Sequence, residues 1–170
     1  MMKLKKPKLP LILALAAASA ALVPYPASAA RAKPNRIAVS YVTPKDPAHQ
    51  PIYDRLKEFR PLEKMKVILS PFRLPHTLLI KTEGCDGESN AWYDDGAITI
   101  CYEYIDEIWR TAPAETTADG VTPLDARVAP VVDTVLHEFG HAIFDILALP
   151  VFGREEDAAD QVAAYMPTGG

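Results

Sequence analysis

The chain has 170 residues, 49% of them hydrophobic and 24% charged, which is long enough to bury a core of its own. It carries 18 basic and 22 acidic residues. This acidic balance argues against binding to nucleic acid or to an anionic membrane surface, because both recruit clusters of lysine and arginine.

Residues 1–29 have the three-part layout of a secretory signal peptide. Lysines gather in residues 3–8, an apolar stretch occupies residues 11–23, and small residues at 27–29 precede the predicted cleavage point. The apolar stretch is shorter than the roughly 20 residues of a membrane-spanning helix. We therefore expect a periplasmic or secreted protein with a single domain over residues 30–170 and no stable membrane insertion. Without the four lysines, 14 basic and 22 acidic residues remain, a formal net charge of −8.

The first half of the mature chain predicts strands alternating with a helix. β-branched residues at Ile37–Val42 and Thr77–Thr82 are typical of strands. Between them, Pro51–Met65 has apolar residues at helical spacing, and Pro61 is expected to end or kink that helix.

The segment Asn90–Glu103 predicts a β-hairpin, because Asp94-Asp95-Gly96 is a turn sequence between two arms with strand propensity. The next residues, Tyr102–Ala112, have helical spacing of their apolar side chains. The chain has two cysteines, Cys85 and Cys101, and an even number in an exported protein favours a disulfide over a zinc site.

A further helix is predicted around the sequence VVDTVLHEFGHAIFDIL, residues 131–147. Thr122 and Asp125 form a capping-box pattern, and Pro123 suits a first helical turn. Pro130 lacks a backbone donor, so the helix is expected either to kink there or to start just before it.

The motif HEFGH lies inside this helix. His137 and His141 are one helical turn apart, so both imidazoles can reach one metal ion. Glu138 lies beside them, in place to act as a general base and then a general acid. Gly140 costs roughly 1 kcal/mol relative to alanine inside a helix, so close packing is expected there. Two histidines on an ordinary helix surface are the structural alternative.

A catalytic zinc usually has three protein ligands. His49 and His76 lie far upstream in proline-containing segments, and we expect both to be exposed loop residues. Acidic candidates lie downstream in Gly153–Met166, which predicts a second helix. These are Glu155, Glu156, Asp157 and Asp160.

Among these acids, Glu156 and Asp160 share a helix face, which suits a ligand carboxylate and a second carboxylate that holds a ligand histidine. Glu156 is therefore the preferred third ligand, with Glu155 and Asp157 as alternatives. The structural alternative to a metal-binding role is that these acids form a solvated first helical turn, which the helix dipole favours.

Two stretches of the sequence resemble an uncharacterised bacterial family of zinc metallopeptidases, gluzincin-like in having HExxH followed by ExxxD. They are HEFGHAIFDILALPVFGREEDAADQVA and GESNAWYDDGAITICYEY. The resemblance implies a compact α+β zincin-like domain with a small mixed sheet, an active-site helix and a glutamate helix. It also implies one Zn²⁺ per chain, held by His137, His141 and Glu156, with Glu138 as the base and Asp160 orienting a ligand.

By the same resemblance, the substrate would lie near an edge strand formed by Asn90, Ala91, Trp92 and Tyr93. Trp92 and Tyr93 also fit ordinary core packing. The sequence ends at Gly170, soon after the glutamate helix, where members of that family continue. A naturally compact enzyme and a shortened one are both consistent with this, and the oxyanion-stabilising residue is not identified.

Taken together, the patterns predict an exported zinc metallopeptidase that hydrolyses peptide or protein substrates. One alternative is a zinc-binding domain without peptidase activity, and another is an envelope interaction domain whose motif is only helix surface. The sequence specifies neither the substrate nor the oligomeric state.

Overall fold

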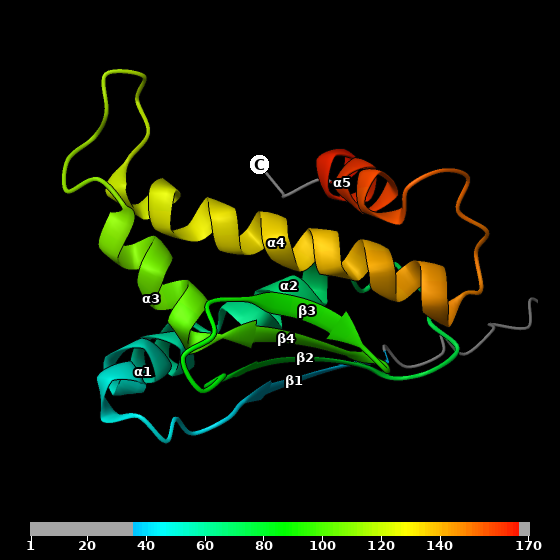
Figure 1. The fold of residues 1–170 in the computed structure, drawn as a ribbon, viewed down its shortest axis with the longest axis horizontal. Helices are drawn as coiled ribbons and strands as arrows, with labels where there is room; N and C mark the ends of the chain where they lie inside the picture. The colour runs from blue at the N-terminus through cyan, green and yellow to red at the C-terminus, as the bar shows by residue number, and fades with distance from the viewer. Residues whose placement is uncertain (1–35, 167–170) are drawn as a thin grey trace, which may run out of the picture. The chain divides into compact units, whose positions relative to one another are not determined.

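A mixed four-stranded sheet forms one layer of the fold. The computed structural model describes residues 36–166, and its sheet and five α-helices confirm the expected α+β class. The strand order is β1-β2-β4-β3, with β1, β2 and β4 parallel and β3 antiparallel to β4 (Figure 1). The strands are β1 (Ile37–Tyr41), β2 (Leu78–Glu83), β3 (Ala91–Asp94) and β4 (Ala97–Cys101). β3 is therefore an edge strand.

Two helices, α1 (Gln50–Phe59) and α2 (Pro61–Ile68), connect β1 to β2. The expected break at Pro61 is confirmed, because Arg60 adopts a left-handed conformation with φ of 50° between the two helices. Pro61 then opens α2, where its fixed φ and missing donor are tolerated. The single helix expected over residues 51–65 is thus two helices.

The remaining helices are α3 (Tyr102–Thr111), α4 (Pro123–Ile146) and α5 (Glu155–Tyr165). The Thr122 side chain accepts from Asp125 N–H, and the Asp125 side chain accepts from Thr122 N–H, which completes the expected capping box. Pro130 lies inside α4. The alternative in which the helix starts just before Pro130 is therefore wrong. The helix begins at Pro123, directly after its N-cap Thr122.

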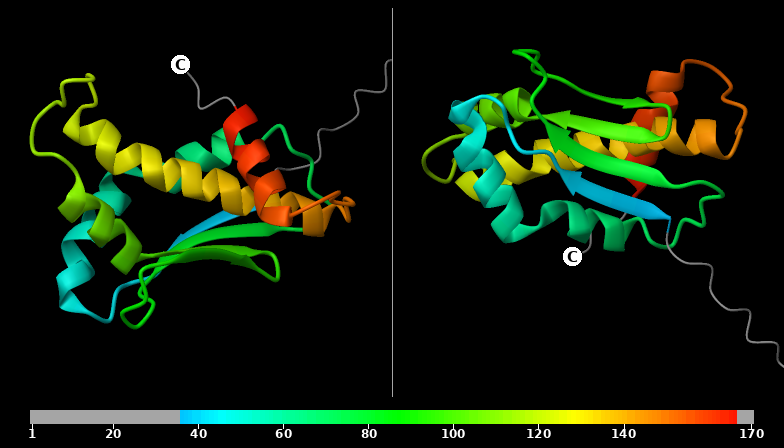
Figure 2. Two further views of the ribbon diagram at one scale, coloured as in Figure 1. Left: turned by 45° about the horizontal axis from the view of Figure 1, so that its top comes forward. Right: turned by 90° about the horizontal axis from the view of Figure 1, so that it is seen from below.

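The core lies between the sheet and the helices. Along β2, buried and half-buried residues alternate, so one face of the strand enters the core. Figure 2 shows α2 and α4 on one face of the sheet, and α5 lies on the side of α4 away from the sheet. The Phe139 ring of α4 meets Phe72 edge-on, with ring centroids 4.9 Å apart.

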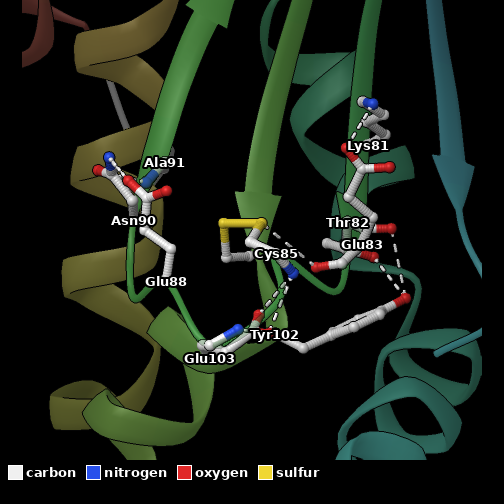
Figure 3. Close-up of a disulfide and its surroundings, with 11 residues drawn as sticks. Lys81, Thr82, Glu83, Cys85, Glu88, Asn90, Ala91, Tyr102 and Glu103 are labelled. Atoms are coloured by element: carbon white, nitrogen blue, oxygen red, sulfur yellow. Dashed lines mark hydrogen bonds and ion pairs between the residues drawn. A yellow bond between two sulfur atoms is a disulfide. The ribbon is translucent and has the colours of Figure 1, made fainter. Parts of the chain in front are cut away.

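The expected disulfide is present between Cys85 and Cys101, with a Cα–Cα distance of 5.5 Å (Figure 3). It ties the loop after β2 to the end of β4. The Glu103 carboxylate accepts hydrogen bonds from Cys85 N–H and Gly87 N–H in the same loop. Burial alone would raise the pKa of Glu103, but these donors outweigh it and hold that pKa below its ordinary value.

The expectation for His49 is wrong. Its side chain is buried, because a 3-10 helix at Pro47–His49, capped by Asp46, carries it against the Tyr102 ring at 5.9 Å between centroids. His76 is exposed, as expected. Within residues 36–166, no helix is both long and apolar enough to cross a membrane. The signal peptide falls outside the described residues, so the division at residue 29 stays a prediction.

Candidate metal centre

Helix α4 presents the two histidines of the HEFGH motif side by side. Because they are four residues apart, their rings lie on one face, with centroids 4.9 Å apart. The Nε2 atoms of His137 and His141 are 3.1 Å from each other. Both side chains are partly buried, so the pair lies at the surface of the core rather than within it.

Helix α5 brings three carboxylates to these rings. Asp160 Oδ1 lies 2.8 Å from His137 Nδ1, and Glu155 Oε1 lies 2.7 Å from His141 Nδ1. Glu156 Oε2 lies between the two rings, 3.2 Å from His137 Nε2 and 3.6 Å from His141 Nε2. The inner group therefore consists of His137, His141 and Glu156. The outer carboxylates are those of Asp160 and Glu155.

The chemistry of the inner group fits a metal ion. An ionised carboxylate only accepts hydrogen bonds, so each Nδ1 must carry the proton that it donates to Asp160 or Glu155. When both rings are neutral, their Nε2 lone pairs converge with a Glu156 oxygen, and this arrangement is repulsive unless a metal ion or an added ring proton lies between the atoms.

The spacing of the same atoms supports this fit. His137, His141 and Glu156 offer ligand atoms that lie 3.1–3.6 Å from one another. Ligands around a tetrahedral zinc, at about 2.0–2.1 Å from the ion, are separated by about 3.3 Å. A second group, Cys85, Cys101 and Glu103, also clusters, but its sulfur atoms are joined in the disulfide and are not available as ligands.

Gly140 allows the two helices to approach closely. A Cβ atom at this position would lie 2.9 Å from the Ala159 Cα and 3.1 Å from the Ala159 Cβ. Both separations are shorter than ordinary van der Waals contact. This contact is the packing reason expected for a glycine inside α4, and it brings the carboxylates of α5 within reach of the histidines.

Glu138 lies beside the cluster and is buried, with 9% of its surface exposed. Its Oε2 accepts a hydrogen bond from the Tyr93 N–H at 2.8 Å. Burial raises the pKa of Glu138 above its ordinary value, and the charges of His137 and His141 and the Tyr93 donor offset this only in part. A raised pKa gives the carboxylate a greater affinity for a proton, which suits an acid–base role.

The expected substrate segment is β3 with the residue before it. Tyr93 reaches the site through its amide, while Ala91 and Trp92 are half-buried in the strand. The Asn90 side chain binds locally, donating to Glu88 and accepting from Ala91 N–H (Figure 3). The structure thus brings β3 to Glu138 and leaves the Asn90 amide in its own loop.

Comparison with known proteins identifies a family for this chain. A protein family described as "putative metallopeptidase" matches residues 41–169. The chain belongs to this metallopeptidase family. No curated protein and no solved structure matches the chain. Membership indicates a peptidase-like hydrolase and implies a metal ion, for which the cluster at α4 and α5 supplies suitable groups.

Two features of this family member escaped sequence reasoning. Glu155 was an alternative ligand, but it holds His141 Nδ1 instead. Its position just before Glu156, on a helix facing the motif helix, was the available signal. The bond from Tyr93 N–H to Glu138 left no local signal, because it joins residues that are 45 positions apart. Asp157 faces Arg154 at 3.9 Å and not the histidines.

Proposed function

We propose that this protein is an exported zinc-dependent metallopeptidase of the gluzincin type. His137, His141 and Glu156 would hold one Zn²⁺ per chain. The observation that carries the proposal is the convergence of their three ligand atoms at 3.1–3.6 Å, while carboxylates from α5 occupy both Nδ1 atoms. Two neutral imidazoles with converging Nε2 lone pairs need a cation between them, either a metal ion or a proton, and zinc content distinguishes the two.

Each protein group has a separate task in this proposal. A bound zinc ion would polarise water and the scissile carbonyl, and it can lower the pKa of water to about 7. Glu138 accepts a proton from the attacking water and passes it to the leaving amine. The Tyr93 N–H fixes the orientation of the Glu138 carboxylate. Asp160 and Glu155 hold the histidines in the tautomer that presents Nε2.

The proposed substrate is an extended peptide or protein segment. β3 is an edge strand that contacts α4 beside Glu138, and an exposed edge can pair with a peptide backbone by strand addition. The acidic balance of the chain supports a function without nucleic acid. Location in the periplasm or medium, without stable membrane insertion, is part of the same proposal and rests on the layout of residues 1–29.

Zinc content of the exported protein tests the metal site. We expect about one zinc per chain in the wild type, much less in His141→Ala, and an unchanged content in His76→Ala, because His76 is exposed and does not belong to the ligand cluster. The N-terminal residue of the same sample reports cleavage after Ala29. Folded wild-type protein that takes up no zinc would refute the proposal.

Peptide cleavage by the wild type and by Glu138→Gln tests catalysis separately. The substitution keeps the three ligands and removes the base, so zinc is retained and cleavage is lost. Zinc binding without cleavage in the wild type, across a peptide library, would instead favour a metal-binding domain that is not an enzyme.

A further inference from the structure

Tyr93 attaches the edge strand to α4 at two points. Its backbone N–H donates to Glu138 Oε2 at 2.8 Å, and its hydroxyl donates to Asp145 Oδ2 at 2.5 Å. Glu138 and Asp145 are two helical turns apart on α4. One residue of β3 therefore spans a length of the helix that includes His141.

The register of the hairpin explains why this amide faces the helix. Cys101 N–H donates to the Asn90 carbonyl, so residues of β3 alternate from there between pairs with and without hydrogen bonds to β4. Tyr93, opposite Ile98, is in a pair without such bonds, and its N–H points away from β4. At a sheet edge this amide has no strand partner, and the Glu138 carboxylate takes that place.

The hydroxyl of Tyr93 also joins the turn of the hairpin to the helix. Gly96 N–H donates to this hydroxyl at 3.1 Å, while the hydroxyl itself donates to Asp145. Burial, and then the bond to Asp145, raise the pKa of Tyr93 to about 12, so the hydroxyl keeps its proton at neutral pH. The chain Gly96–Tyr93–Asp145 is therefore a continuous donor-to-acceptor series from the turn to α4.

We infer that the Tyr93 hydroxyl and Asp145 form a positioning contact that holds the β3 edge against α4 and aims the Tyr93 amide at Glu138. Both residues lie outside the group of three proposed ligands. The contact would keep the peptide-binding edge and the base in one fixed relation, and this catalytic consequence rests on the proposed function. The inference that this contact holds β3 against α4 does not depend on the proposed function.

Hydrogen exchange at the Tyr93 amide tests the geometric part. We expect Tyr93→Phe and Asp145→Ala to raise the exchange rate of this amide by about tenfold or more, because each removes a hydrogen bond to a charged group. Asp145→Asn keeps an acceptor and should preserve most of the protection. Since Asp145 is exposed, its substitution leaves the core intact even if Tyr93→Phe folds poorly.

The matched control is Tyr104→Phe. It also removes a tyrosine hydroxyl bonded to α4, the 2.6 Å contact with Thr134 Oγ1, but from α3 rather than from β3. We expect the Tyr93 amide to exchange at the wild-type rate in this variant. Unchanged exchange in both Tyr93→Phe and Asp145→Ala, or an equal increase in the control, would overturn the inference.

Steady-state kinetics with a cleaved peptide tests the catalytic part. Asp145→Ala should raise KM by about tenfold, with a smaller fall in kcat and unchanged zinc content, because the edge moves while the ligands stay. Asp145→Asn should restore KM. An unchanged KM with faster amide exchange would overturn the catalytic consequence alone. Absence of zinc and cleavage in the wild type would refute the proposed function, and the exchange result would still decide whether the contact holds β3.

Discussion

Replacement of Gly140 by alanine is the most direct test of how α5 reaches the histidines. The added methyl carbon would lie 2.9 Å from the Ala159 Cα and 3.3 Å from its carbonyl oxygen. Carbon atoms in favourable contact are about 3.5–4.0 Å apart, so α5 must move away by about 0.5 Å or more. The atoms in its way belong to a helix backbone, which does not yield as the end of a flexible side chain would.

Two opposing terms set the effect on stability. Alanine gains about 1 kcal/mol over glycine in a helix interior, while overpacking costs about 1–3 kcal/mol. We expect the free energy of unfolding to fall by about 0–2 kcal/mol, a modest change. The effect on the metal is larger, because a shift of α5 displaces Glu156 and both outer carboxylates together. Disturbed outer contacts alone cost about 10–100-fold in metal affinity.

Competition with a chromophoric chelator measures zinc affinity, and denaturant unfolding of the same samples measures stability. Gly84→Ala is the control, since a Cβ there would lie 4.0 Å from its nearest neighbour, Glu103 Oε1. Adding Ala159→Gly to Gly140→Ala removes one of the clashing atoms and should restore part of the affinity. A Gly140→Ala variant that is more stable than the wild type and binds zinc equally well would refute the reasoning.

Three further outcomes are expected. Glu155→Ala should weaken zinc binding by about 10–100-fold, because His141 loses its Nδ1 partner, whereas Asp157→Ala should leave the affinity unchanged. Glu103 has a folded-state pKa below its ordinary value of 4.5, so its stabilising effect is complete above that value and is lost as pH falls through the lowered pKa. The stability advantage of the wild type over Glu103→Gln, from urea titrations at several pH values, should therefore shrink on acidification, and a constant difference would contradict this. Phe139→Ala should cost about 3–5 kcal/mol in the same urea assay, since the ring is fully buried; a loss below 1 kcal/mol would mean that the core is looser than the structure shows.

Much of the secondary structure could be predicted because its signals are local. The capping box at Thr122 and Asp125, the break at Pro61 and the turn at Asp95-Gly96 each depend on residues within four positions of one another. The histidine pair of HEFGH belongs to the same class, because helix periodicity alone places both rings on one face. The burial of His49 was missed, since it depends on a contact with Tyr102, the first residue of the distant helix α3.

The sequence by itself determined the class of fold, the motif helix and the histidine pair that a metal requires. Only the tertiary structure decided which acid faces which ring atom, because the close packing of α5 on α4 at Gly140 and Ala159 sets those contacts. The tertiary structure alone also supplied the Tyr93 donor for Glu138, since these two residues are 45 positions apart and meet only when the core forms. Local hydrogen bonds and secondary-structure propensities depend on residues a few positions apart. The geometry of a site depends on packing between segments that are remote in the chain.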